Sequence, residues 1–329
     1  MFRFRYCVMV AAIALAAIAV GACGGEDSDE STELTVMSFN IYGGGVNSGK
    51  TDLADTAAAI EAADADIVGV QETRGESRPC TANVCPAAGP SIAQDLADEL
   101  GYEVYEQTAE NDALWANAIL SRYPIGESTP NDTGVEIDVD GRSVHMFNVH
   151  LDDSPYGPYQ LLDIDYGGFP ALSTEQAAIK WAQRTRGPAL DLLFEDMDAA
   201  GDADATFVTG DFNEPSGLDW TEEAVTEGGY QPIEVDWPTT RAITDRGFVD
   251  TYREIHPDPV ADPAFTWTPS GDPDDEFDHH DRIDFVLAKA EDGLEVTGAS
   301  IVGESKQAAE IVSKPWPSDH RASVATVQF

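Results

Sequence analysis

The chain has 329 residues, of which 42% are hydrophobic, enough for one large domain or two small ones. It carries 61 acidic and 18 basic side chains, a formal net charge of −43 at pH 7. Because such a surface repels polyanions, the composition disfavours nucleic acids and anionic membranes as partners unless basic residues are locally concentrated.

The N-terminal segment has the features of an export signal. It reads "MFRFRYCVMVAAIALAAIAVGAC", in which two arginines precede an uncharged apolar run that is too short for a comfortable transmembrane helix. The last four letters resemble a bacterial lipobox, so residues 1–22 are predicted to be a lipoprotein signal peptide and Cys23 the lipidated N-terminus. Residues 23–33 would then form a lipid anchor and acidic tether. We expect an exported protein, lipid-anchored to the outer face of a bacterial membrane, or secreted if Cys23 is not lipidated.

Two further cysteines, Cys80 and Cys85, frame the sequence "CTANVC". In an exported chain this spacing favours one disulfide that closes a small loop. A zinc pair is the weaker alternative, because no second Cys/His pair has a matching spacing.

Strand-like and helical patterns alternate along the rest of the chain. Apolar and β-branched runs predict strands over residues 34–42, 65–73, 115–125, 144–153, 205–213, 282–288 and 317–329. Apolar residues at three- and four-residue spacing predict helices over 52–65, 91–101 and 173–201, the last of them bent or interrupted at Pro188. This alternation indicates the α/β class, and the absence of a later linker predicts a single domain over residues 34–329.

Two long segments between these elements look irregular. Residues 152–170, "DDSPYGPYQLLDIDYGGFP", carry aromatic residues among glycines and prolines and are expected to be neither helix nor strand. Residues 268–281, "TPSGDPDDEFDHHD", are expected to form a solvated loop in which acidic neighbours raise the pKa of His279 and His280. Loops of this length usually serve a function or are disordered.

The predicted strand ends repeatedly present carboxylate, amide and imidazole groups, which is what an α/β active site requires. Their residues are Asn40, Glu72, His150, Asp152, Asp211, Asn213, Asp284, Asp319 and His320. Carboxylate and amide oxygens are hard ligands, suited to Mg²⁺, Mn²⁺ or Ca²⁺. Such a cation can hold a phosphate oxygen while a carboxylate activates water and a histidine donates, so the set favours phosphoester hydrolysis.

The stretch "TGDFNEP" carries the most informative pair. Asp211 and Asn213 alternate along a predicted extended segment, so both side chains are expected to leave the same face and to meet one phosphate and its water. Glu214 would point the other way and serve structure. Taken alone, G-D-x-N is more often a turn.

Seven motifs stand in the order that characterises one known superfamily: "SFNIY", "DIVGVQET", "NAILSRYPI", "NVHLDD", "TGDFNEP", "DRIDFVL" and "SDHRASV". From about Leu34 to Phe329 the chain therefore resembles the endonuclease/exonuclease/phosphatase superfamily. That group includes pancreatic-type deoxyribonucleases, abasic-site endonucleases, neutral sphingomyelinases and inositol polyphosphate 5-phosphatases. The resemblance implies a DNase I-like four-layer α/β sandwich, with two packed mixed β-sheets flanked by helices. It is specific for the superfamily and not for a substrate.

The resemblance also implies a metal site. Glu72 would be the principal ligand, with Asn40 beside it and Asp319 contributing directly or through water. The implied cofactor is Mg²⁺, with Mn²⁺ or Ca²⁺ as alternatives.

By the same motifs, Asp211 would position or deprotonate the attacking water, and Asn213 would hold a phosphate oxygen. His320 would contact the scissile phosphate, with Asp284 fixing its tautomer and raising its basicity. His150 would be a phosphate ligand or a general acid.

Four residues are candidates for substrate binding. Asn117, in "NAILSR", would sit near the phosphate, whereas Asp152 is either a substrate contact or part of a solvated turn. Tyr156 and Tyr159 form either a stacking wall for a sugar, an inositol or a base, or a packed surface loop. Trp115 either lines the cleft or packs in the core.

Together these features predict a monomeric, metal-dependent phosphoesterase that acts on a small, lipid-linked or sugar-linked phosphodiester. An extracellular nuclease of the same fold is the alternative, which the net charge disfavours. A non-catalytic binding lipoprotein is a third candidate. It is disfavoured because the expected core groups are all present: Glu72, Asp211, Asn213, Asp284, Asp319 and His320.

Overall fold

The structure, a computed structural model, describes residues 31–45, 52–76, 87–269, 271–272, 275–290 and 293–329. The chain divides into two units, Met1–Ser31 and Thr32–Phe329, and the second carries the elements given below. The predicted signal peptide, the lipidation site Cys23 and the predicted disulfide pair Cys80 and Cys85 lie outside the described residues. Within those described ranges, no helix is both long enough and apolar enough to cross a membrane.

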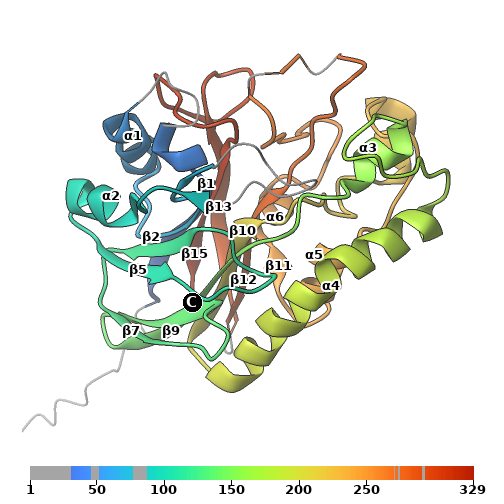
Figure 1. Cartoon of the computed structure of the whole chain (residues 1–329). Coiled ribbons are helices and arrows are strands. Elements are labelled where there is room, and N and C mark those ends of the chain that lie inside the picture. The colour runs from blue at the N-terminus through green and yellow to red at the C-terminus, as the bar shows by residue number, and fades with distance from the viewer. Residues whose placement is uncertain (1–30, 46–51, 77–86, 270, 273–274, 291–292) are drawn as a thin grey trace, which may run out of the picture. The chain divides into compact units, whose positions relative to one another are not determined.

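Two mixed β-sheets form the centre of the second unit (Figure 1). The larger has the order β14-β13-β15-β1-β2-β6-β5, with β1 Glu33–Asn40, β2 Ile67–Gln71, β5 Glu103–Gln107, β6 Asn117–Ser121, β13 Glu295–Gly303, β14 Ile311–Val312 and β15 Ala322–Gln328. The smaller has the order β11-β12-β10-β9-β8-β7, with β7 Ile125–Ser128, β8 Gly134–Val139, β9 Arg142–His150, β10 Ala205–Asp211, β11 Val249–Asp250 and β12 Asp284–Ala290. Strands β3 (Gly75–Glu76) and β4 (Ala87–Ala88) pair separately.

Helices cover the outer face of each sheet (Figure 1). Helices α1 (Leu53–Ala63) and α2 (Ala93–Leu100) pack on the larger sheet, and α4 (Glu175–Ala200) and α5 (Pro238–Thr244) pack on the smaller one. Shorter elements are α3 (Gly157–Leu162), α6 (Thr251–Ile255), the 3-10 turn η1 (Tyr42–Gly45) and the π turn η2 (Ala224–Gly228). This arrangement confirms the predicted four-layer α/β sandwich.

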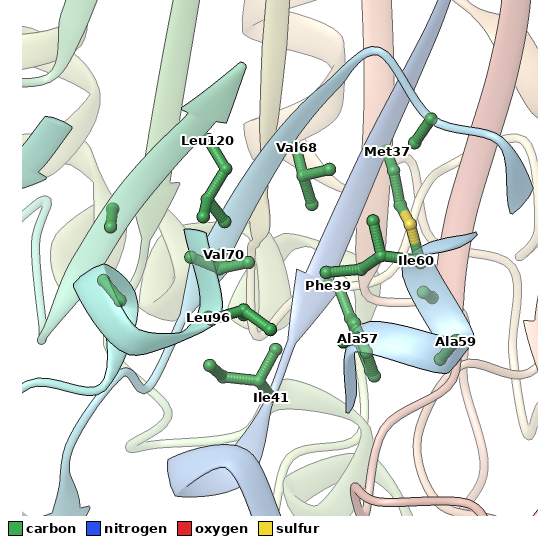
Figure 2. Packing of buried hydrophobic residues seen from close by; sticks show 14 of the residues in the cluster. Met37, Phe39, Ile41, Ala57, Ala59, Ile60, Val68, Val70, Leu96 and Leu120 are labelled. Atoms are coloured by element: carbon green, nitrogen blue, oxygen red, sulfur yellow. The ribbon is translucent and has the colours of Figure 1, made fainter. Parts of the chain in front are cut away.

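The side-chain alternation of β1 shows how the layers are held together. Leu34 and Val36 pack into the core between the two sheets. Met37 and Phe39 belong to the cluster under α1 and α2, where Ile60 packs with them (Figure 2). A strand buried on both faces reads as a nearly continuous apolar run, as "LTVMSF" does.

Several strands lie where the sequence predicted none, and the longest of them are β5, β8 and β13. In β8, buried Val135, Ile137 and Val139 alternate with exposed Glu136 and Asp138. Acidic residues on the solvent side interrupt the apolar run, so this half-buried strand shows as an alternation of apolar and acidic residues and not as the continuous apolar run of the predicted strands.

Helix α4 continues through Pro188, so the interruption that was one of the two predicted outcomes is wrong. It begins after Thr174, whose hydroxyl accepts a hydrogen bond from the backbone N–H of Ala177 at 3.3 Å. Pro188 is exposed, so its ring and the carbonyl that lacks its N–H partner face water. Residues 152–170 are also more regular than predicted, because α3 lies within them and carries Pro158 in its first turn.

The acidic segment 268–281 is not the solvated loop that the sequence predicted around the two histidines, since His279 and His280 are both buried. Asp281 accepts a hydrogen bond from the hydroxyl of Tyr156 at 2.6 Å. Burial lowers the pKa of His280, against the prediction, whereas at His279 the carboxylate of Asp281 outweighs burial and raises the pKa. The acidic composition of this segment could not predict its burial, because aromatic residues that contact it come from distant parts of the chain.

Candidate active site

Strand pairing brings the predicted site residues to one edge of both sheets. In the larger sheet β1 and β2 run in parallel, and their register places Glu72 immediately beyond the partner of Asn40. In the smaller sheet Asp211, at the end of β10, lies opposite both His150 and Asp284. Side chains far apart in the sequence therefore converge at the strand ends.

Asp211 lies at the centre of this convergence and is 1% exposed. Its Oδ2 accepts a hydrogen bond from Nδ2 of Asn40 at 3.0 Å and lies 3.6 Å from Nε2 of both His150 and His320. Its Oδ1 accepts a hydrogen bond from the backbone N–H of Asn213 at 2.9 Å. One carboxylate thus stands between two imidazoles, as a group that orients water between proton donors must.

His320 and Asp284 form a buried pair beside Asp211, with 2.9 Å between His320 Nδ1 and Asp284 Oδ2. Burial alone would lower the pKa of His320, but the carboxylates of Asp284 and Asp211 outweigh it and raise the pKa well above its usual value. Burial raises the pKa of Asp284 to about 6, although His320 opposes that shift. At neutral pH the pair is therefore an imidazolium and a carboxylate, and His320 Nε2 is a proton donor.

Glu72 has a left-handed backbone, with φ 58°, a conformation that costs energy for a residue with a side chain. Its Oε1 accepts a hydrogen bond from Asn40 Nδ2 at 3.0 Å, and its buried Oε2 has no hydrogen-bond partner. Burial raises the pKa of Glu72 to about 7; His150 lowers it, and the carboxylate of Asp319 raises it further. A buried carboxylate oxygen without a partner, beside a second carboxylate, is a candidate ligand atom for a cation.

A divalent cation fits this corner. Glu72 and Asp319 offer the hard carboxylate oxygens that Mg²⁺, Mn²⁺ and Ca²⁺ prefer. Oδ1 of Asn40 accepts one hydrogen bond, from the backbone N–H of Tyr42 at 3.1 Å, and keeps a second lone pair, so Asn40 stays a candidate ligand, while its amide nitrogen faces the acids. Asn40 therefore aligns Glu72 with Asp211 by donating hydrogen bonds to both.

A second buried group could also hold a metal. Ligand atoms of Asp211, Asp284 and His320 lie within 4.8 Å of one another. Nδ1 of His320 is paired with Asp284, which leaves Nε2 as its nitrogen for a metal. The carboxylates of Glu72 and Asp319 offer the other candidate site, made of hard oxygen ligands alone.

Asn213 and Asn117 differ from what the sequence suggested. Asn213 is not in an extended segment beside Asp211, because β10 ends at Asp211 and Asn213 has φ 48°. Its Nδ2 donates to the carbonyl of Leu151 at 2.9 Å, so its side chain ties two loops together. Asn117 is buried at the start of β6, and its Nδ2 has no hydrogen-bond partner. That amide is a donor available at the predicted position in the motif.

The predicted substrate residues of the 152–170 segment are placed unevenly. Asp152 is exposed and accepts a hydrogen bond from the backbone N–H of Ser154 at 3.0 Å, as in a solvated turn. Tyr156 and Tyr159 are 5% and 8% exposed, and their rings contact each other and Trp267 edge-on or tilted. The hydroxyl of Tyr156 donates to Asp281 and that of Tyr159 to Asp278. The two tyrosines therefore form a packed cluster and offer no open stacking wall.

Trp115 lies at the edge of the site, where its ring meets that of His150 edge to face, with centroids 5.9 Å apart. The turn that carries it is constrained: Ala116 has φ 53°, and Asn117 Oδ1 accepts from the backbone N–H of Trp115 at 3.2 Å. Trp115 is only partly buried and lies beside His150, so the alternative of a core role is wrong.

Sequence reasoning missed Arg186 as a residue of the site. It lies on α4 and donates hydrogen bonds to the carbonyls of Phe212 and Asn213, directly after Asp211. The sequence offered one signal: Arg186 is a charged residue on the buried face of an amphipathic helix, one turn from Ala182 and from Leu190.

Comparison with known proteins bears on both fold and family. A family model described as "Endonuclease/Exonuclease/phosphatase family" matches residues 37–320. An uncharacterized protein of Caenorhabditis elegans is 28% identical over 316 residues, covering 91% of this chain and 92% of the relative.

Solved structures of similar fold come from bacteria and animals. An endonuclease/exonuclease/phosphatase from Beutenbergia cavernae has a TM-score of 0.52 and 18% identity, covering 90% of this chain and 72% of its own. A humanized TDP2 of Danio rerio has a TM-score of 0.51 and 14% identity, covering 90% and 98%. A family protein from Leptotrichia buccalis has a TM-score of 0.51 and 13% identity, covering 90% and 100%. At these identities the likeness concerns the fold.

Proposed function

The chain belongs to the endonuclease/exonuclease/phosphatase family, and on that premise we propose that it hydrolyses a phosphodiester with an activated water. The observation that carries the proposal is the position of Asp211, whose Oδ2 lies 3.6 Å from Nε2 of both His150 and His320. Such a set can hold a water and a phosphate at once, because it offers a proton acceptor between two donors.

Asp211 orients and deprotonates the attacking water. Its carboxylate is oriented by the amide nitrogen of Asn40 on one oxygen and the backbone N–H of Asn213 on the other, and lone pairs remain that can accept from a water. Holding nucleophile and phosphate in one geometry removes much of the entropic cost of the reaction.

His320 donates from Nε2 to a non-bridging phosphate oxygen, since Asp284 holds Nδ1 and keeps the ring protonated. His150 faces the same acid from the other side, and its Nδ1 is buried with no hydrogen-bond partner. In the proposal His150 is the second phosphate contact or the acid that protonates the leaving oxygen.

The cation would be held by Glu72 and Asp319, with Asn40 aligning Glu72. When bound, it would neutralise charge on the phosphate oxygens, and the hard ligand set favours Mg²⁺, with Mn²⁺ or Ca²⁺ as alternatives.

The substrate we propose is small, lipid-linked or sugar-linked, with one phosphate at the site. Most arginines of the described residues pair with carboxylates of the chain: Arg122, Arg142, Arg186, Arg241, Arg246, Arg253, Arg282 and Arg321. Nucleic acids draw much of their affinity from neutralised flanking phosphates, and cations already paired with acids serve that role poorly. A nuclease of the same fold is the competing function.

The test uses the purified chain without its signal segment on three substrates: a chromogenic phosphodiester, a chromogenic phosphomonoester and plasmid DNA. Each is run with Mg²⁺, Mn²⁺, Ca²⁺ or a chelator, at low and high salt, beside Asp211→Asn. Metal-dependent cleavage of the diester, lost in the variant and with DNA intact, is the expected result. Rapid nicking of DNA supports the nuclease instead, and no turnover of any substrate contradicts both.

We also propose that the mature protein is exported and lipid-anchored through Cys23, because "VGAC" follows an apolar run with two N-terminal arginines. Cys23→Ser should release the protein from the membrane fraction of a bacterial host. Equal membrane retention of both forms contradicts the lipid anchor.

A further inference from the structure

Arg186 lies on α4, and its side chain, which is 1% exposed, lies between two loops of the candidate active site. Its Nε donates to the carbonyl of Phe212 at 3.1 Å, and its Nη2 donates to the carbonyls of Asn213 at 2.6 Å and Pro155 at 3.3 Å. Phe212 and Asn213 follow Asp211, the last residue of β10. Pro155 lies in the other loop of the site, which follows β9 and its last residue, His150. One guanidinium thus joins both loops.

The contacts are unlike those of an ordinary buried ion pair. The partner carboxylate of Arg186 is Glu214, whose Oε2 lies 3.5 Å from Nη1, longer than a good hydrogen bond. By contrast, Arg282 donates four hydrogen bonds to the carboxylates of Asp219 and Asp250. The planar guanidinium of Arg186 therefore donates its hydrogen bonds to backbone carbonyls, and the carboxylate of Glu214 mainly balances its charge.

The clamp acts on the peptide that holds Asp211. Asn213 has φ 48°, in the left-handed region, which Asn adopts more readily than most residues with a side chain. In that conformation its N–H donates to Asp211 Oδ1 at 2.9 Å, and its Nδ2 donates to Leu151 at 2.9 Å. If the Asn213 peptide turned away, the carboxylate of Asp211 would lose the donor that fixes its orientation.

We propose that Arg186 is a positioning residue: it clamps the Phe212 and Asn213 carbonyls so that the Asn213 N–H orients the carboxylate of Asp211. Arg186 acts through the loop and does not touch the phosphate. The part that concerns the reaction rests on the proposed hydrolysis, whereas the clamp itself can be measured without any activity.

The first test is Arg186→Lys, which keeps the charge and loses the planar fork. We expect kcat to fall about 100-fold with KM changed little, because a small misplacement of a catalytic group has roughly that effect while substrate contacts persist. The matched control is Arg253→Lys, a buried arginine that donates to Asp219 and to the carbonyls of His256 and Asp262, away from the two loops. It should lower stability and leave kcat per folded molecule unchanged.

A second variant guards against misfolding. Arg186→Met with Glu214→Gln removes both charges together, so neither is left buried alone. It should fold by circular dichroism and still show the lowered kcat. Wild-type kcat in either folded variant would overturn the proposal, and so would loss of folding in both, since Arg186 would then serve the fold.

Amide hydrogen exchange separates the clamp from the chemistry. In Arg186→Lys, peptides over residues 205–217 should exchange faster than in the wild type, while peptides over β15 should not change. Faster exchange in a protein without hydrolytic activity would support the clamp and reject the proposed function. Unchanged exchange over 205–217 would overturn the clamp whatever the activity.

Discussion

Nδ1 of His320 lies 2.9 Å from Oδ2 of Asp284, and both side chains are buried. The contact fixes which ring nitrogen faces Asp211, because only Nε2 remains free to turn toward it, at 3.6 Å from Oδ2. Burial lowers the pKa of His320, but the carboxylates around the ring outweigh burial and raise it, so Nε2 is a donor at neutral pH.

Replacing Asp284 by Asn should keep the shape of this pair and remove its charge. The ring would lose the carboxylate that keeps it protonated, and we expect kcat to fall roughly 100-fold or more, the range for removing a general acid or base. The measurement is kcat on the chromogenic diester, with circular dichroism to check the fold. Glu99→Gln, at an exposed position of α2, is the control that should change nothing. Wild-type kcat in Asp284→Asn would remove the pair from the mechanism.

Replacing Glu72 by Gln should separate metal binding from folding. Burial raises the pKa of Glu72 to about 7, above its ordinary 4.5, so in the metal-free protein stability is lost as the pH rises from the unfolded pKa through the folded one, and the full cost is present above it. In chelator at pH 8, Glu72→Gln should therefore melt no lower than the wild type. With metal the order should reverse, because a ligand at 100 times its Kd stabilises by about 2.7 kcal/mol. An equal thermal shift with Mg²⁺ in both proteins would exclude Glu72 as a ligand.

His145 should contribute to acid sensitivity. Burial lowers its pKa from 6.5, with Glu136 opposing the shift, so the unfolded chain takes up this proton at a higher pH than the folded chain. Its stabilising contribution is full above the unfolded pKa and is lost as the pH falls toward the folded one. Urea midpoints measured from pH 8 to 5 should fall less steeply in His145→Gln than in the wild type. Identical slopes would show that His145 is protonated equally in both states.

Gly69 should tolerate no side chain, because an added Cβ would lie 2.1 Å from Thr209 Oγ1 and 2.6 Å from Asn148 Oδ1. Asn148 donates from the smaller sheet to the carbonyls of Val70 and Ala118 in the larger one, so a shift there would disturb the contact between the sheets. We expect Gly69→Ala to destabilise by about 1–3 kcal/mol, as overpacking does.

The control for Gly69 lies within α4. An added Cβ on Gly187 meets nothing within 4 Å, so Gly187→Ala should be neutral or stabilise by up to about 1 kcal/mol. Urea denaturation measures both variants, and equal stability of Gly69→Ala and the wild type would contradict the close packing.

The convergence of the candidate site residues could be predicted because they stand in short motifs at strand ends. Asn40, Asp211 and Asp284 end or begin strands whose apolar runs are visible in the sequence, and parallel or antiparallel pairing then brings them together. The fold class followed from the same runs, since strands buried on both faces alternate with amphipathic helices.

Backbone conformation could not be predicted at the same positions. Glu72 and Asn213 both have positive φ, which neither residue type demands and which only the surrounding contacts enforce. An extended backbone at Asn213 was the natural expectation from "FVTGDFN", and it is wrong because the chain turns to form the clamp with Arg186.

Contacts between distant segments were equally hidden. Tyr156 contacts Asp281 and Trp267, which lie more than a hundred positions along the chain, while His279 packs against Trp220 and His280 against Phe265. The composition of residues 152–170 suggested a wall for the substrate, and that of residues 268–281 suggested a solvated loop. Tyr156 and Tyr159 of the first segment instead donate hydrogen bonds to Asp281 and Asp278 of the second, so these contacts serve the fold.

The most direct test of the account is the rate of hydrolysis of a chromogenic phosphodiester by the wild type and by Asp211→Asn, each with Mg²⁺ and with chelator. The carboxylate of Asp211 lies between His150 and His320, and the amide of Asn213 fixes it. The account predicts turnover in the wild type with Mg²⁺, none with chelator, and a loss of at least about 100-fold in the variant. Equal rates in wild type and variant, or hydrolysis that persists in chelator, would contradict it.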